Sequence, residues 1–80
     1  MEVKCHIIAI MATTREKLGS KIKDLRGKQG LTQEKLAEMA GIDYSYLNLI
    51  ESGKRNPSLK VIAKLSRVLK VKLPELLTFK

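Results

Sequence analysis

A chain of 80 residues is long enough for one small domain, so its hydrophobic core must be modest. Lys and Arg number 16 against 8 Asp and Glu, and the net charge of +8 favours a polyanionic partner, either nucleic acid or an anionic membrane surface. A hydrophobic content of 44% with only 4% aromatic residues is typical of a compact helical bundle. The single cysteine excludes an intramolecular disulfide and indicates a reducing cytoplasm.

The first segment, residues 1–12, is apolar but has no clear periodicity. A short strand, a dimer-stabilising arm and a disordered tail all remain open, and Met11 is an alternative true start. The run CHIIAIMA is far shorter than the roughly 20 residues that a membrane-spanning helix needs. It also lacks a convincing basic leader, which disfavours a signal peptide. We therefore expect residues 1–13 to be an arm, extension or tail, and residues 14–80 to be the folded domain.

A first helix is predicted to begin at Thr13 or Thr14, because Thr13 and Glu16 form a capping box. It should end near Gly30, after a basic last turn that suits the helix dipole. Its apolar positions are Leu18, Ile22 and Leu25.

The strongest pattern lies between Gln33 and Ser52, where apolar residues recur at helical spacing on both sides of Gly41. Gly41 can take the left-handed conformation that costs other residues roughly 1–2 kcal/mol. Thr32 should cap the helix before this glycine and Asp43 the helix after it, which predicts a helix-turn-helix. The positions expected to pack inside are Leu36, Ala37, Gly41, Leu47 and Ile50.

Two further helices are predicted after the motif. The Asn56-Pro57-Ser58 turn starts a fourth helix that runs through Leu69, and Pro74 suits the first turn of a fifth helix through Leu77. The inner side of the fourth helix should carry Leu59, Ile62, Ala63, Leu65 or Val68, and Leu69. An apolar C-terminal surface, which either closes the core or forms a dimer seam, comprises Leu73, Leu76, Leu77 and Phe79. The pattern predicts an all-α fold with five helices.

The second helix of a helix-turn-helix enters the DNA major groove, and residues near its N-terminus reach base edges. Here these residues are Tyr44, Ser45 and Asn48, on the face opposite Leu47 and Ile50. An Asn side chain can bond adenine in a bidentate way, Ser can donate or accept, and a Tyr ring can pack on a thymine methyl group. This face is the predicted base-reading surface.

Other polar residues suit the DNA backbone. Gln33 opens the first motif helix, where backbone N–H groups favour a phosphate, and its amide suits a phosphate or a base edge. Lys54, Arg55 and Asn56 form a basic loop past the recognition helix, which is typical of contacts that do not read sequence. Tyr46 is expected to pack against the domain or to contact a phosphate.

Catalysis and metal binding find no support in the sequence. The single Cys and single His, Cys5 and His6, provide no nucleophile–base pair with an orienting group. Two adjacent ligands without a partner cluster are weak evidence for a metal site. We therefore predict no enzyme activity, no metal and no cofactor.

Six segments carry a further signal: Leu25-Arg26, Gly30–Ala37, Ala40–Ile42, Tyr46-Leu47, Ile50-Glu51 and Gly53–Leu59. Together they resemble the phage repressor/Cro (XRE) family of DNA-binding domains over about residues 15–77. The resemblance implies a five-helix domain that binds operator DNA, usually as a dimer, and in which Arg26 pairs with Glu51 near a phosphate. The complete predicted DNA-binding set is Arg26, Gln33, Asp43, Tyr44, Ser45, Tyr46, Asn48, Lys54, Arg55 and Asn56.

Two positions depart from the family pattern. Many relatives carry Arg at the position of Leu49, and Tyr44 puts a bulky ring where shorter polar residues are frequent. We predict a sequence-specific regulator of transcription that binds double-stranded DNA in the cytoplasm, as a homodimeric repressor or autoregulator. The alternative is a protein-interaction module, or an antitoxin-like protein, that uses the same fold to bind a protein partner. Membrane binding is disfavoured because the apolar and basic residues are organised for a globular core.

Overall fold

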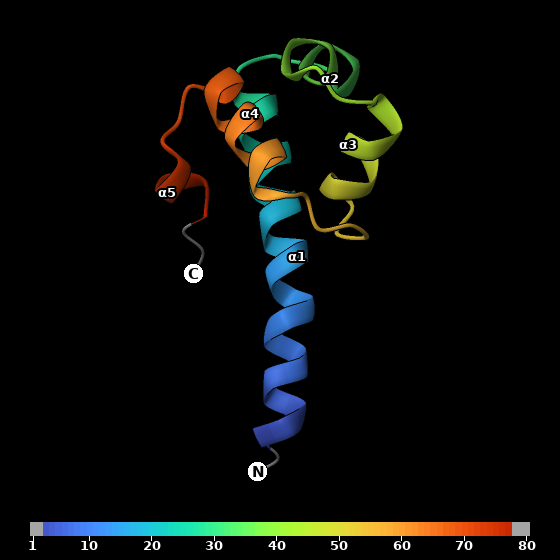
Figure 1. The fold of residues 1–80 in the computed structure, drawn as a ribbon, viewed down its shortest axis with the longest axis vertical. Helices are drawn as coiled ribbons and strands as arrows, with labels where there is room; N and C mark the ends of the chain where they lie inside the picture. The colour runs from blue at the N-terminus through green and yellow to red at the C-terminus, as the bar shows by residue number, and fades with distance from the viewer. Residues whose placement is uncertain (1–2, 78–80) are drawn as a thin grey trace.

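The computed structural model describes the backbone of residues 3–77 and the side chains of residues 14–77. Within this range the chain forms helices and no strand (Figure 1). The elements are α1 (Val3–Lys28), α2 (Gln33–Ala40), α3 (Tyr44–Glu51), α4 (Leu59–Leu69) and α5 (Leu73–Leu76). The predicted all-α fold with five helices is therefore confirmed.

Helix α1 begins at Val3 and runs without a break through Thr13 and Thr14, so the predicted helix start at a threonine cap is wrong. The backbone of residues 3–12 is helical, so the short strand that the sequence left open is not formed. The segment contains neither Gly nor Pro, so no residue in it interrupts the helix. The N-terminal half of α1 projects beyond the other helices, which gather around its C-terminal half (Figure 1).

The core lies where the C-terminal half of α1 meets the other four helices. Helix α3 packs against α1 and α2, α2 also packs against α4, and α5 contacts both α4 and α1. The buried apolar residues are Leu18, Ile22, Leu36, Ala37, Ala40, Leu47, Ile50, Ile62, Leu65, Leu69 and Leu76. The predicted inner positions of α1, α2 and α3 belong to this core, with Leu25 partly buried against it, except for Gly41. Gly41 ends α2 in the turn and is exposed, so its predicted inward position is wrong.

Gly19 brings α1 and α3 into backbone contact. A Cβ atom at this position would collide with the carbonyl oxygen of Ile50 and would lie 2.8 Å from that of Glu51. Gly27, further along the same helix, has nothing within 4 Å of the corresponding point. The close approach at Gly19 therefore fixes how the C-terminal end of α3 sits on α1.

The turn between α2 and α3 follows the prediction at Gly41 and departs from it at Asp43. Gly41 has φ 70° and ψ 37°, the left-handed conformation. The N–H of Ile42 donates to the carbonyl oxygen of Ala37 at 3.0 Å, which closes α2. Asp43 occupies the N-cap position of α3 but its side chain makes no cap hydrogen bond, so that part of the prediction is wrong. The helix nevertheless begins there, because the backbone carbonyl oxygen of Asp43 accepts from the N–H of Leu47 at 3.0 Å.

The caps of α2 and α4 are formed by side chains. Thr32 Oγ1 accepts from the N–H of Lys35 at 3.0 Å, as predicted, and Ser58 Oγ accepts from the N–H of Val61 at 3.2 Å. At its other end α4 is capped by Lys70, which has φ 61°. Among the described residues, Lys70 is the one non-glycine residue in the left-handed region.

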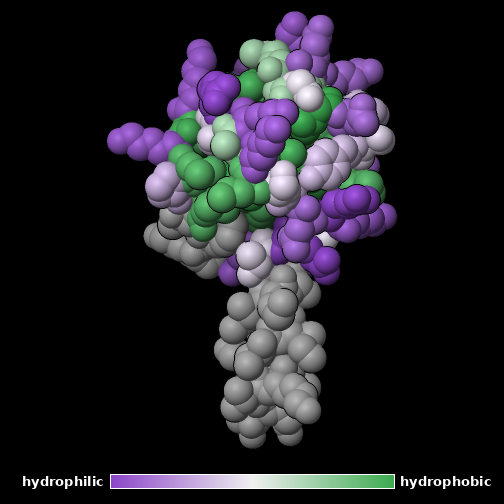
Figure 2. All heavy atoms as spheres, viewed as in Figure 1, coloured by the Kyte–Doolittle hydropathy of each residue, from purple (hydrophilic) through white to green (hydrophobic). Residues whose placement is uncertain are grey.

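The C-terminal helices divide their apolar residues between core and surface. Leu65 is fully buried and Leu76 closes the core, whereas Val68 and Leu73 are only partly buried. Leu59 is 64% exposed, so its predicted inward position is wrong. It is the first residue of α4, and the helix reaches the core only one turn later. Hydrophobic side chains gather on the surface over α4 and α5 (Figure 2), where Leu77 is 40% exposed. Phe79 lies outside the described residues.

Candidate nucleic-acid interface

Helix α3 has an inner and an outer face with opposite surroundings. Leu47 and Ile50 are fully buried on the inner face. Tyr44, Ser45 and Asn48 are exposed on the outer face, where the Tyr44 side chain is 50% accessible. The structure therefore brings the three predicted base-reading residues together on one exposed surface. All three belong to the first turns of α3, the part of a recognition helix that reaches base edges.

A bidentate ion pair ties α1 to the C-terminal end of α3. Arg26 Nε donates to Glu51 Oε2 at 2.8 Å, and Arg26 Nη2 donates to Glu51 Oε1 at 3.0 Å. A third donor, Arg26 Nη1, bonds the carbonyl oxygen of Leu31 at 2.8 Å. The side chain of Glu51 is only 2% exposed and that of Arg26 is 15% exposed. The pair is therefore shielded from solvent, unlike an exposed ion pair, which contributes little to stability.

Gln33 connects this ion pair to the outer face of α3. Its Nε2 donates to Glu51 Oε1 at 2.9 Å, while its Oε1 accepts from Asn48 Nδ2 at 3.2 Å. The first residue of α2 thus bridges the buried carboxylate and an exposed amide. We call Arg26, Glu51, Gln33 and Asn48 the polar network.

The loop after α3 carries two basic residues, Lys54 and Arg55, followed by the neutral Asn56, and all three are exposed. The Arg55 guanidinium lies over the ring of Tyr46, 5.8 Å from its centroid, within the range of a cation–π interaction. Tyr46 is itself half-buried and packed against the core. Tyr46 on α3 thus contacts both the core and Arg55 of the following loop.

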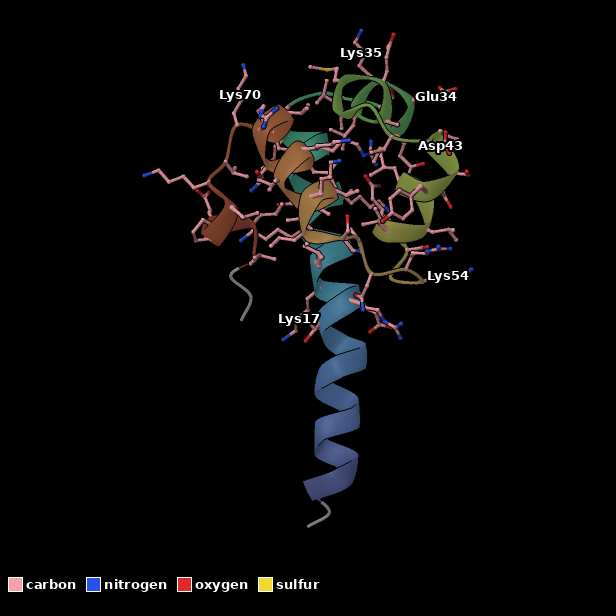
Figure 3. All side chains as sticks on the ribbon, viewed as in Figure 1. Lys17, Glu34, Lys35, Asp43, Lys54 and Lys70 are labelled. Carbon is pink, nitrogen blue, oxygen red and sulfur yellow. The ribbon has the colours of Figure 1, made fainter. Side chains whose placement is uncertain are left out.

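The charges are unevenly distributed along this surface. Figure 3 shows Asp43 and Lys54 at opposite ends of α3, with Glu34 near the Asp43 end. Carboxylates repel phosphates, so the Lys54 end is the better site for the DNA backbone. An exposed Asp43 suits an amino group on a base edge, since a carboxylate only accepts hydrogen bonds.

Some features of this surface have little signal in the sequence. The Gln33–Asn48 hydrogen bond depends on how α2 and α3 cross, which periodicity does not reveal. The contact of Arg26 with the Leu31 carbonyl likewise depends on the loop after α1. Gly19 does leave a signal, because a glycine inside a helix is unfavourable by about 1 kcal/mol and often indicates a close packing contact.

Chemistry of other kinds is not assembled in the described part of the chain. Among those residues no three His, Cys, Asp or Glu side chains group as metal ligands. No described helix is long and apolar enough to cross a membrane. The side chains of Cys5 and His6, the weak metal candidate, lie outside the described residues.

Known proteins with a helix-turn-helix are similar to this chain. The helix-turn-helix family model matches residues 22–76. An uncharacterised HTH-type transcriptional regulator of Archaeoglobus fulgidus is 37% identical over 60 residues, which cover 75% of this chain and 86% of that protein.

Two solved structures are also similar. The restriction-modification controller protein C.AhdI of Aeromonas hydrophila has 43% identity and a TM-score of 0.74, covering 76% of this chain and 92% of that one. The biofilm master regulator SinR, solved in complex with DNA, has 40% identity and a TM-score of 0.74, covering 76% of this chain and 98% of that one.

Proposed function

The chain belongs to the XRE-type helix-turn-helix family of DNA-binding transcriptional regulators, and we propose that it is a homodimeric regulator that reads operator DNA with the outer face of α3. The family consists of DNA-binding regulators and not of enzymes. The observation that carries the proposal is the exposure of Tyr44, Ser45 and Asn48 on the first turns of a helix whose opposite face is fully buried.

In this proposal the polar residues divide into two groups. Tyr44, Ser45 and Asn48 face the base edges, with Asp43 beside them at the start of the helix. Backbone contacts come from the residues that flank α3, which are Arg26, Gln33, Tyr46, Lys54, Arg55 and Asn56. The support for this division is the placement of the basic loop at the C-terminal end of α3 and of Gln33 at the N-terminus of α2, where N–H groups favour a phosphate.

The regulatory role and the dimer are further parts of the proposal. A role as repressor or autoregulator is supported by the likeness to C.AhdI, which is a restriction-modification controller. For the dimer seam we favour the surface near Leu77, because Leu76 is fully buried in the core of the same chain and Leu77 is 40% exposed. We assign residues 1–13 to an extension of the DNA-binding domain formed by residues 14–80. A cytoplasmic location is supported by the single cysteine, which a reducing compartment leaves unpaired.

The proposal is tested by in vitro selection of random duplex DNA with the purified protein at near-physiological salt. We expect enrichment of a two-fold repeat whose half-sites lie about 34 Å apart, or a multiple of that distance, because each half-site meets one recognition helix. Absence of any enriched sequence, together with affinity that falls steeply as salt rises, would contradict the proposal. That result would favour a protein-interaction module that contacts DNA through charge alone.

A further inference from the structure

The polar network has a defined direction of hydrogen bonding that ends on the base-reading surface. Glu51 accepts both from Arg26 and from Gln33, and Gln33 accepts in turn from Asn48. Gln33, which links the buried ion pair to the exposed amide, therefore donates toward Glu51 and accepts from Asn48.

This direction follows from the chemistry of the groups. An ionised carboxylate can only accept, so the Gln33 amide must turn its NH₂ group toward Glu51. Its oxygen then faces Asn48, and only the Nδ2 group of Asn48 can bond an acceptor there. The carboxylate is itself positioned by two donors of Arg26 and is almost fully buried, so this end of the network is fixed.

The orientation of Asn48 determines what remains available to DNA. One Nδ2 hydrogen is used by Gln33, while Oδ1 accepts no hydrogen bond from any residue in the range 14–77. Asn48 thus offers one acceptor and one remaining N–H. The adenine edge in the major groove presents the complementary pair, the N6 amino donor and the N7 acceptor. Guanine presents two acceptors, O6 and N7, one of which would face the Asn48 oxygen.

We propose that Gln33 and Glu51 are positioning residues that fix the amide of Asn48 and so specify adenine over guanine at the base pair that Asn48 faces. The inference rests on the proposed function, in which α3 reads the major groove. It assigns to Gln33 a role in base choice besides any contact with a phosphate.

The central experiment compares four duplexes that differ only at the base pair where Asn48→Ala alters preference. Wild-type protein should prefer adenine to guanine by about tenfold or more, as expected of a good bidentate contact. Gln33→Ala frees the Asn48 amide to rotate, and the preference should fall to about threefold or less. Arg55→Ala is the control, since it should weaken binding to all four duplexes and leave the ratio unchanged. A Gln33→Ala protein that binds all four duplexes more weakly but keeps the wild-type ratio would overturn the inference.

A double variant tests the direction of the network. In Gln33→Glu with Glu51→Gln, the amide at position 51 can donate to the carboxylate at position 33, which still accepts from Asn48. We expect this protein to recover at least half of the wild-type preference on a logarithmic scale. Loss of preference equal to that of Gln33→Ala, in a protein whose thermal melting remains cooperative, would contradict the inference.

A measurement without DNA separates this inference from the proposed function. Asn48→Asp puts an acceptor against the Gln33 oxygen, so it should lower the melting temperature by about 4 °C or more. In a Gln33→Ala background the same change should have less than half that effect. Equal effects in the two backgrounds would overturn the network even if DNA binding is specific. If the thermal effects differ as expected but wild-type protein selects no DNA sequence, the proposed function fails and not the network.

Discussion

The inner and outer faces of α3 are made under different constraints. On the inner face, Leu47 and Ile50 are buried and their shapes must fit the core. The backbone at Ile50 also contacts α1 so closely that only glycine fits at position 19. On the outer face, Tyr44 and Ser45 contact solvent, so the fold leaves their chemistry free to suit a ligand. Asn48 lies between these cases, because it is exposed but bonded to Gln33. Changes on the inner face should therefore alter stability, and changes on the outer face should alter recognition.

The largest expected effect comes from Gly19→Ala on the α1 side of this contact. The added methyl group would force α3 away from α1. We expect the free energy of unfolding to fall by about 3 kcal/mol, as in an overpacked core. Thermal unfolding should show a melting temperature lower by more than about 12 °C. The matched control is Gly27→Ala on the same helix, which has open space and should gain up to about 1 kcal/mol in stability. Equal effects of the two substitutions would contradict the close approach.

The turn that sets the position of α3 gives the next largest effect. Gly41→Val places a β-branched residue at φ 70°, and we expect a loss of about 2 kcal/mol in unfolding free energy, measured by urea denaturation. Gly41→Asn is the control, since Asn tolerates this conformation better and should lose less than half as much. A Gly41→Val protein as stable as wild type would remove the left-handed turn from the account.

On the outer side, Arg55→Ala should leave stability almost unchanged and weaken binding to all DNA sequences. The expected change is a decrease of about one unit in the slope of log affinity against log salt, because one phosphate contact is lost. Lys70→Gly is the control. It removes a positive charge on the far side of the bundle from α3 (Figure 3), at a position whose φ of 61° suits glycine. The Arg55 contact would be excluded if both variants gave the wild-type slope.

The sequence predicts the structural features that depend on residues close together in the chain. Gly41, the Thr32 cap and the apolar spacing of α2 and α3 are all encoded within a few residues, and they agree with the structure. The inner face of α4 is also encoded locally, but periodicity does not tell how far along the helix the core extends, so it predicts an inward position for Leu59 that the structure does not show. The capping box at Thr13 does not identify the start of α1, because a threonine cap is optional when the preceding residues also continue the helix.

The candidate site was predictable in its residues but not in its connections. Tyr44, Ser45 and Asn48 follow from the motif, and the Arg26–Glu51 pair follows from the family resemblance. The link through Gln33 depends on the relative placement of α1, α2 and α3, and no pattern within one helix contains that information.

The most direct test of the account is a base-by-base comparison of wild-type and Asn48→Ala proteins on the selected duplex. The Asn48→Ala protein should lose about 1–3 kcal/mol of discrimination at one base position in each half-site, while its thermal unfolding remains cooperative. Every other position should keep its wild-type preference. An equal loss of affinity for all duplexes would contradict the account, because it would show that Asn48 contacts the backbone and that α3 does not read bases there.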